Sequence, residues 1–477
     1  MTLLWSGEEL IAATGGRPFG NLPEGVTGIS IDTRTMKRGE AFFAIKGDRF
    51  DGHDFATAAV VAGAAVMVVS EERLPALGRL AIPKIVVPDV LKALQDVARA
   101  ARARSRARII AVTGSAGKTT TKEMLRVALE SAGPVHAAEN SFNNHWGVPL
   151  TLARLPVDAK FGVFEIGMNH PGEIEPLVKL VQPHVAIVTM VAGAHLGHFS
   201  SLEEIAKAKG EIFSGVISGG QAIINRDDAR WNLLAKIAMD AGIQNVWGFG
   251  ENPRAQFRLV SWEPGENGSS LTVRIAGQEI TGQIGAPGRH MVQNALAVLG
   301  AGYLVGADVQ HMLDALSRFK PAEGRGQRFR LKHPEGGTFT VIDESYNANP
   351  ASMRAALHLL SAASVPEGAR RIAVLGDMLE LGEHSARLHE ALGELVSSAK
   401  TDLLFIAGNE MQALAARSPS GTHVEYRSTV SELEPMVLAA VKPGDIIVIK
   451  SSKSAGFSKL VEALLKHFPA ADAPADA

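Results

Sequence analysis

The stretch IIAVTGSAGKTTT, residues 109–121, decides the fold class of this chain, and the helix-period run KEMLRVALESAG follows it. An apolar strand passes through a glycine-containing loop into a helix, so backbone N–H groups and the positive helix end converge on one point. Such a point binds phosphate, with Lys118 able to reach the outer phosphates and the Thr119 hydroxyl able to join the shell of a magnesium ion. The loop therefore predicts a site for ATP or GTP.

The match to the pattern GxxxxGK[ST] is incomplete, because Val112 occupies the place of the first glycine and Gly114 shortens the loop. A strand-to-helix turn with a chance Gly–Lys pair is the alternative. We favour nucleotide binding because the strand, the loop and the helix all agree with it.

From the strand before this loop onward, short apolar runs recur. Each is followed by a turn and by a stretch whose apolar residues have the spacing of a helix, which is typical of parallel βα units. These runs are RIIAVT, FGVFEIG, VAIVTMV, QAIINRD, FTVIDES, RIAVLGD, DLLFIAG and DIIVIKS. Between the two sets of four, AQFRLVSW and SLTVRIAGQEITGQI alternate in polarity and predict antiparallel hairpins appended to the central domain. The fold class is predicted to be α/β.

The length of 477 residues suggests about three domains at roughly 150 residues each. The charged, glycine-interrupted segment AEGRGQRFR, residues 322–330, marks one boundary. The arginine-rich segment QDVARAARARSRAR, residues 95–108, marks the other, and we interpret its arginines as a solvated helix face. The predicted domains are residues 1–107, 108–320 and 321–477.

Composition excludes several classes of function. With 48 basic and 50 acidic residues the net charge is −2, which gives no field for binding nucleic acid, so an anionic ligand must be held by local groups. The chain has no cysteine, which excludes disulfides, thiolate zinc sites, iron–sulfur clusters and a cysteine nucleophile. Glu8 and Glu9 interrupt any signal-peptide core, and the longest nearly apolar run, residues 55–69, is too short to span a membrane. We expect a cytoplasmic protein.

Two further positions could hold a metal ion near the phosphates. Glu165 ends the run FGVFEIG, and a carboxylate at the C-terminal edge of a parallel strand faces the phosphate crevice, although it could equally be a capped strand end. His195 follows the run VAIVTMV, although a lone histidine is more often structural. Ser201 and Glu204 predict a capping box, which places Lys207 and Lys209 on a helix, where lysines are usually solvated.

Several motifs occur together in one order along the chain: IDTRTMKRGEAFFAIKGDRFDGHDF, TGSAGKTTTKE, SFNNHWGVPLTL, FEIGMNHPGEI, AHLGHF, AKAKGEIF, GRHMVQNALAV, IDESYNANPASM and LGDMLELG. Together they resemble the ATP-dependent Mur ligases of peptidoglycan synthesis. The resemblance implies an N-terminal uridine-nucleotide-binding α/β domain and a central P-loop ATPase domain with a parallel sheet and a small antiparallel sheet. It also implies a C-terminal, Rossmann-like, doubly wound domain.

The resemblance also implies roles for individual residues. The catalytic residues would be Lys118, His195 and Lys209. The nucleotide-binding residues would be Gly114, Ser115, Ala116, Gly117, Lys118, Thr119, Thr120, Asn294, Arg325, Asp343 and Glu344. The substrate-binding residues would be Thr33, Arg34, Lys46, Asp51, Asn143, Asn144, Tyr346, Asn347 and Asn349. The metal ligands would be Thr119, Glu165, His195 and Lys209, the last as a carbamate that turns an ammonium group into a carboxylate-like ligand.

Taken singly, several of these residues also have a structural explanation. Asn294 could cap a turn, Arg325 could be a linker charge, and the polar residues of SYNANP could be turn chemistry before a helix. The chain also departs from the family pattern at Met190, at Met291 and in KSSKSA, where KGSRSA is usual.

The motifs SYNANP and GDMLELG resemble the Mur ligase that adds D-alanyl-D-alanine to UDP-N-acetylmuramoyl-tripeptide. The implied reaction uses ATP and two Mg²⁺ ions, passes through an acyl phosphate, and is carried out by a monomer without nucleic acid or a membrane span. The alternatives are a MurE-like ligase, whose Asn/Asp-Pro-Arg motif is missing here, a folylpolyglutamate-synthase-like ligase, a kinase, or a P-loop switch protein.

Overall fold

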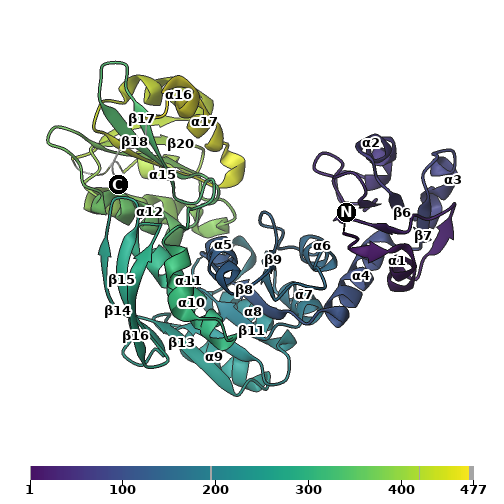
Figure 1. Ribbon diagram of the computed structural model, residues 1–477. Helices are drawn as coiled ribbons and strands as arrows, with labels where there is room; N and C mark the ends of the chain where they lie inside the picture. The colour runs from purple at the N-terminus through teal and green to yellow at the C-terminus, as the bar shows by residue number, and fades with distance from the viewer. Residues whose placement is uncertain (1, 194–195, 418, 420, 472–477) are drawn as a thin grey trace.

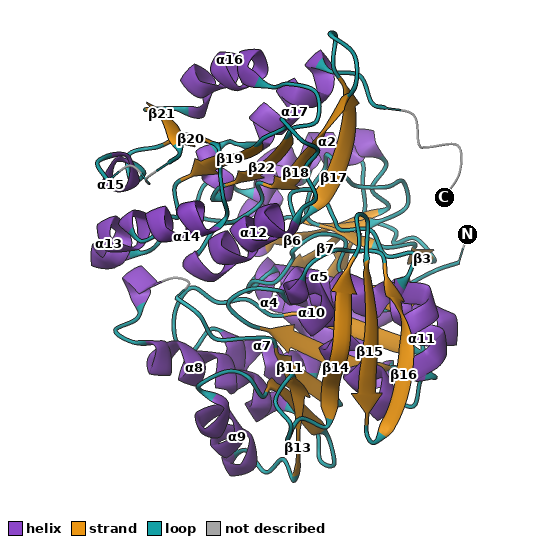
Figure 2. Cartoon of the chain, turned by 90° about the vertical axis from the view of Figure 1, so that its left-hand side faces the viewer, coloured by secondary structure: helices purple, strands orange, loops and turns teal. Residues whose placement is uncertain are grey.

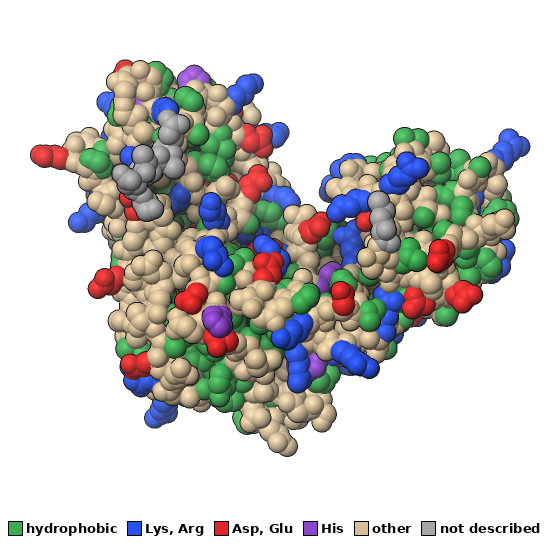
Figure 3. Space-filling model, viewed as in Figure 1, with side chains coloured by type: hydrophobic (Ala, Val, Ile, Leu, Met, Phe, Trp, Pro, Cys, Tyr) green, Lys and Arg blue, Asp and Glu red, His purple; other side chains and the backbone are tan. Residues whose placement is uncertain are grey.

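The computed structural model describes residues 2–193, 196–417, 419 and 421–471. It has three α/β lobes in chain order, with the central lobe joining the other two (Figure 1). The N-terminal and C-terminal lobes stand apart across a notch above the central lobe, which the space-filling view shows as a hollow between them (Figure 3).

The N-terminal lobe is built on a five-stranded sheet of order β2-β7-β6-β5-β4 and a two-stranded β1-β3 sheet. The strands are β1 (Trp5–Ser6), β2 (Arg17–Phe19), β3 (Gly25–Val26), β4 (Ile29–Ser30), β5 (Ala41–Phe43), β6 (Val66–Ser70) and β7 (Lys84–Val87). The helices are α1 (Gly7–Thr14), η1 (Gly52–Phe55), α2 (Ala56–Ala62), η2 (Glu71–Arg73), α3 (Leu74–Leu77) and α4 (Val90–Arg104).

The helix α4 corrects the interpretation of the arginine-rich segment as a solvated face. One side of it, including Leu94, Val97 and Ala101, is buried in the core. Arg102 donates hydrogen bonds to the carbonyl oxygens of Val181 (2.9 Å) and Gln182 (2.8 Å) in the central lobe. The segment therefore fastens the N-terminal lobe to the central lobe.

The central lobe holds one nine-stranded sheet of order β16-β15-β14-β13-β12-β11-β8-β10-β9. Its strands are β8 (Arg108–Thr113), β9 (Val135–Ala137), β10 (Phe161–Glu165), β11 (Val185–Val188), β12 (Gln221–Asn225), β13 (Asn245–Gly250), β14 (Phe257–Pro264), β15 (Ser269–Ile275) and β16 (Gln278–Ile284). The strands β8 to β13 are parallel. Of these, β8, β10, β11 and β12 were predicted, whereas β9 and β13 were not. The strands β14–β16 form the predicted antiparallel hairpins and continue the same sheet, because β14 pairs with β13 (Figure 2).

Helices cover both faces of this sheet because the apolar strands bury side chains in two separate clusters. One face is covered by α5 (Lys118–Leu129), α10 (Arg289–Leu304) and α11 (Val309–Leu316). The other is covered by α6 (Gly147–Ala153), α7 (Ile174–Val181), α8 (Leu202–Gly210) and α9 (Trp231–Asp240). Short 3-10 turns lie at η3 (Glu130–Ala132), η4 (Leu196–His198) and η5 (Glu211–Gly215).

The C-terminal lobe has a six-stranded sheet of order β17-β18-β22-β19-β20-β21, parallel except for the edge strand β17. The strands are β17 (Gln327–Lys332), β18 (Thr338–Glu344), β19 (Arg371–Gly376), β20 (Leu403–Ala407), β21 (His423–Arg427) and β22 (Ile446–Lys450). The helices are α12 (Pro350–Ala362), η6 (Gly382–His384), α13 (Ser385–Glu390), α14 (Leu392–Ser398), α15 (Gln412–Ala415), α16 (Val430–Ala440), η7 (Lys453–Ala455) and α17 (Ser458–His467). Two core clusters, one on each face, confirm the doubly wound prediction.

We keep residues 1–107, 108–320 and 321–477 as proposed domains, since β8 begins at Arg108 and the last central helix ends at Leu316. Within the described residues, no helix is both long and apolar enough to cross a membrane.

Candidate active site

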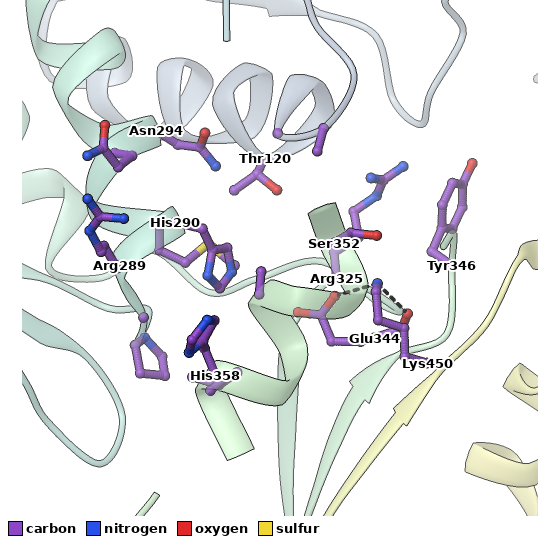
Figure 4. Close-up of a pocket in the computed structure, with 18 of the residues that line it drawn as sticks. Thr120, Arg289, His290, Asn294, Arg325, Glu344, Tyr346, Ser352, His358 and Lys450 are labelled. Atoms are coloured by element: carbon purple, nitrogen blue, oxygen red, sulfur yellow. Dashed lines mark hydrogen bonds and ion pairs between the residues drawn. The ribbon is translucent and has the colours of Figure 1, made fainter. Parts of the chain in front are cut away.

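The main cavity of the structure lies between the central and C-terminal lobes and has a volume of about 1390 Å³. Its central-lobe wall comprises residues Ser115–Thr120 and the start of α10, and its C-terminal wall includes Arg325, Glu344 and α12. Figure 4 shows Thr120 and Asn294 on one side of it and Glu344, Lys450 and Ser352 on the other. The site is therefore assembled from two lobes.

The loop between β8 and α5 needs glycine at two positions. Gly117, the N-cap of α5, has φ +82°, and Gly114 has φ +154°, both in the region that other residues avoid. A Cβ at Gly114 would lie 1.8 Å from Thr189 Oγ1, so the backbone can run this close only without a side chain. The two glycines thereby allow the chain to turn from β8 into the N-terminus of α5 beside the cavity.

Lys118 is at the first position of α5, and its Nζ donates to the carbonyl oxygen of Gly114 at 2.8 Å. The side chain borders the cavity, but the surrounding protein removes most of its hydration. This desolvation lowers the pKa of Lys118; nearby Glu165 opposes the shift and Arg325 adds to it. Lys118 is thus a poorly hydrated cation that an incoming phosphate would stabilise.

The hydroxyl of Thr119 donates to Glu165 Oε2 at 2.8 Å. Asn143 Nδ2 donates to the other carboxylate oxygen, Oε1, at 2.7 Å. Ser141 Oγ lies 3.2 Å from Thr119 Oγ1, and this loop residue was not predicted. Glu165 is only 2 % exposed, so the hydrogen bonds stabilise its charge and hold its orientation. These hard oxygens are of the type that Mg²⁺ prefers as ligands.

Lys209 contradicts the expectation that a lysine on this helix would be solvated. It is 2 % exposed, and desolvation together with the charge of Lys118 holds its pKa well below the ordinary value. A buried lysine with a lowered pKa has the free amine needed to form a carbamate. His195, the other candidate ligand for a second metal, lies outside the described residues. Within the part of the chain that is described, no group of three or more His, Asp or Glu side chains could hold a metal.

The C-terminal lobe makes polar contacts with the phosphate loop and with the loop residue Ser141. Arg325 Nη2 donates to Ser141 Oγ at 3.0 Å, and the guanidinium lies 4.0 Å from the ring centre of Tyr346. Asn349 Nδ2 donates to the carbonyl oxygen of Ser115 at 3.2 Å. Arg325, Tyr346 and Asn349 all line the cavity.

Other predicted residues have structural partners as well. The carboxylate of Asp343 accepts hydrogen bonds from the backbone N–H groups of Gly324 (2.9 Å) and Ser345 (3.0 Å) and is buried, so Glu344 is the member of this pair that lines the cavity. Asn144 Oδ1 accepts from the N–H of Gly147, and Asn347 Oδ1 accepts from the N–H of Ala348, both at 2.9 Å. Asn347 still borders the cavity. Asn294 packs against the Gly117 backbone, and Ala116 is also in the lining.

The four N-terminal candidates do not line this cavity. Arg34 is exposed and pairs with Asp32, whereas Lys46 and Asp51 form an isolated β-bridge. Asp51 also pairs with Arg73 and His53. Their role in binding uridine diphosphate, like that of Thr33, stays a prediction.

Comparison with known proteins gives a consistent result along the whole chain. Family models for the Mur ligase family catalytic domain, the Mur ligase middle domain and the Mur ligase glutamate ligase domain match residues 25–102, 112–302 and 325–453. The chain is 35 % identical to the UDP-N-acetylmuramoyl-tripeptide–D-alanyl-D-alanine ligase of Escherichia coli K12, over 92 % of this chain and 94 % of that protein. The chain belongs to the Mur ligase family.

Relatives and solved structures agree on the type of Mur ligase. The enzyme of the same name from Bacillus subtilis is 32 % identical over 92 % of this chain and 93 % of its own. The crystal structure of MurF from Acinetobacter baumannii has a TM-score of 0.83 and 30 % identity, over 97 % of this chain and 99 % of that one. MurF from Thermotoga maritima in complex with ADP has a TM-score of 0.77 and 25 % identity, over 92 % and 97 %.

Two residues at the cavity of this Mur ligase were not predicted from the sequence: Ser141 was not identified, and Lys450 was given no role. Ser141 is the first residue of the run SFNNHW, and its position at the start of a polar loop was the sequence feature that could have indicated a role. Lys450 ends the apolar run DIIVIKS; it is buried, and its Nζ bonds Glu344 Oε2 at 3.3 Å and the Asn347 carbonyl oxygen at 2.9 Å. A positively charged residue at the end of a buried strand was the sequence feature that could have indicated a role for Lys450. The departures Met190 and Met291 both border the cavity.

Proposed function

We propose that this Mur ligase uses ATP to join UDP-N-acetylmuramoyl-tripeptide to D-alanyl-D-alanine, in the synthesis of peptidoglycan precursors. The observation that carries the proposal is the cavity in which Lys118, Thr119 and Glu165 of one lobe face Arg325 and Asn349 of another. A two-lobe site suits a reaction that needs a nucleotide and two further substrates to meet. A cytoplasmic location and a monomeric state belong to the same proposal.

The triphosphate of ATP would lie on the N–H groups of the loop Ser115–Thr120, with the ammonium group of Lys118 on the transferring phosphoryl group. Asn294 would contact the adenine, and Arg325 the ribose and phosphates. Two Mg²⁺ ions, one on Thr119 and Glu165 and one on His195 and carbamylated Lys209, would neutralise phosphate charge when bound.

In the first step the terminal carboxylate of the tripeptide attacks the γ-phosphorus, the bond to the β-phosphate oxygen breaks, and ADP leaves. Lys118 and Arg325 stabilise the negative charge that spreads over the phosphoryl oxygens. Because a carboxylate does not condense with an amine at neutral pH, this step replaces a poor leaving group with phosphate.

In the second step the free amine of D-alanyl-D-alanine attacks the acyl phosphate. The tetrahedral intermediate loses a proton from nitrogen and expels inorganic phosphate, which leaves the amide of the pentapeptide. Contacts such as Asn349 to Ser115 would hold the lobes together and exclude the water that hydrolyses acyl phosphates.

The N-terminal lobe would hold the nucleotide end of the acceptor, through Thr33, Arg34, Lys46 and Asp51. Asn143 and Asn144 would lie along the muramoyl group, and Tyr346 and Asn347 near the reacting end. The notch between the lobes gives the long acceptor a path from the N-terminal lobe to the cavity (Figure 3).

The test is phosphate release combined with mass spectrometry of the products. A ligase releases phosphate only with both substrates present and yields UDP-muramoyl-pentapeptide. Release independent of the two substrates would indicate a switch protein, and a stable phosphorylated product would indicate a kinase. An amide formed with a diamino acid or with glutamate in place of the dipeptide would indicate a MurE-like or a folylpolyglutamate-synthase-like enzyme.

A further inference from the structure

Lys122 is a buried cation with no part in the chemistry above. It lies in α5 one helical turn after Lys118 and is 0 % exposed. Its Nζ donates to the carbonyl oxygens of Ala138 (2.6 Å) and Asn140 (3.0 Å) and pairs with Glu123 Oε1 at 2.6 Å. These partners use all three N–H donors of the ammonium group, which offsets the cost of burying it.

The two carbonyl oxygens belong to a loop that has left the sheet. The strand β9 pairs with β10 only through residues Val135–Ala137. The segment 138–143 that follows belongs to no helix or strand. Asn140 has φ +82°, a left-handed conformation that asparagine tolerates better than most residues other than glycine, and a contact to its backbone restrains it further. The hydrogen bond from Lys122 to the Asn140 carbonyl supplies such a restraint.

This loop, residues 138–143, carries the side chains that orient the site. Ser141 contacts both Thr119 and Arg325, and therefore touches the phosphate loop and the C-terminal lobe. Asn143 holds Glu165 through its side chain, and its carbonyl oxygen accepts from the N–H of Gly167 at 2.8 Å. A shift of the loop would move all of these groups together.

We propose that Lys122 is a positioning residue for ligation, which fixes the loop 138–143 and through Ser141 and Asn143 orients Thr119, Glu165 and Arg325. The inference rests on the proposed function and adds to it a residue that reaches the reacting groups only through others.

Lys84 offers a matched control in the N-terminal lobe. It is also 0 % exposed, and its Nζ donates to two carbonyl oxygens, those of Leu80 (2.9 Å) and Ile82 (2.8 Å). It does not border the cavity. The variants Lys122→Met and Lys84→Met therefore remove the same buried group from two sites where it bonds two carbonyl oxygens. Only Lys122 also pairs with a carboxylate, that of Glu123, and only Lys122 is connected to the site.

The experiment compares wild type, Lys122→Met, Lys122→Arg and Lys84→Met by thermal unfolding, phosphate-release kinetics and hydrogen exchange. Both methionine variants should lower Tm. Only Lys122→Met should lower kcat, by about tenfold or more as for other groups that orient a metal ligand. Only it should speed exchange at the amide of Asn143, which bonds to the Ser141 carbonyl oxygen. Lys122→Arg, which keeps donors for the two carbonyl groups, should recover part of the kcat.

A folded Lys122→Met with kcat and loop exchange within about twofold of Lys84→Met overturns the inference. If Lys122→Met does not fold, Lys122→Gln, whose amide is too short to reach both carbonyl groups, takes its place under the same criteria. A wild-type protein without ligation would instead overturn the proposed function, and the exchange data would still decide whether Lys122 holds the loop.

Discussion

The side-chain amide of Asn349 joins the C-terminal lobe to the phosphate loop. Its Nδ2 donates to the carbonyl oxygen of Ser115 at 3.2 Å, and its Oδ1 accepts from the N–H of Ser352 at 2.9 Å, which caps α12. One residue thus ends a helix in one lobe and touches the nucleotide-binding backbone of another. The position of the C-terminal lobe is therefore coupled to the geometry of the loop.

The two roles of Asn349 separate by substitution. Asn349→Ser keeps a good helix cap but is too short to reach Ser115, whereas Asn349→Ala loses both. We expect Asn349→Ser to raise the KM for ATP about fivefold, for the loss of a hydrogen bond of about 1 kcal/mol, with little change in Tm. Asn349→Ala should show the same KM and an additional loss of about 1 kcal/mol of stability. Equal KM values for Asn349→Ser and wild type would contradict the coupling.

Removing the charges of the phosphate site should strongly reduce ligation while leaving the fold intact. Lys118→Ala removes the cation at the transferring phosphoryl group, and Glu165→Gln keeps an acceptor for Thr119 but removes the negative charge that attracts a cation. Each should lower kcat about 100-fold or more. Phosphate-release assays over a range of Mg²⁺ concentrations test this, and full activity in either variant would show that the site has been assigned to the wrong residues.

Lys209 should be essential as a carbamate. Lys209→Ala should lose activity and recover part of it with added short carboxylic acids, because these supply the missing carboxylate-like ligand. Lys207→Ala is the control, since Lys207 is exposed on the same helix. Loss of activity without any rescue in Lys209→Ala would argue against the carbamate.

Asp51 predicts a dependence of stability on pH in the N-terminal lobe. Burial alone would raise the pKa of Asp51, but hydrogen bonds from Arg73 and His53 outweigh it and lower the pKa to about 2. Because the folded pKa lies below the unfolded one, the stabilisation is complete above about pH 4 and is lost as the pH falls towards 2. Asp51→Asn should therefore cost about 1 kcal/mol at neutral pH and much less near pH 2. Urea unfolding at several pH values measures this, and a constant difference would refute it.

Much of the fold could be predicted from the sequence, because the patterns that indicate strands and turns are local. The apolar runs ending at Thr113, Glu165 and Lys450 form strands at the predicted places, since a buried parallel strand needs a continuous apolar run. The phosphate loop could be predicted for the same reason, because Gly114 and Gly117 lie within one strand–loop–helix unit.

The features of the site that could not be predicted from the residues alone depend on contacts between residues far apart in the sequence. Lys209 looks like any helical lysine, and its burial comes from packing that its neighbours in sequence do not report. Ser141 acts by touching Arg325, which is 184 residues away. Arg102 was interpreted as solvated because its partners, backbone carbonyl groups of another lobe, leave no pattern in the sequence around it. The roles at Lys209 and Arg325 were available only through the family resemblance.

The central claim is that ATP activates the acceptor's own carboxylate as an acyl phosphate. It is tested most directly with UDP-muramoyl-tripeptide whose terminal carboxylate is labelled with ¹⁸O, by mass spectrometry of the phosphate released during ligation. If the carboxylate attacks the γ-phosphorus, each phosphate released carries one labelled oxygen. Pentapeptide formation with unlabelled phosphate would contradict the account.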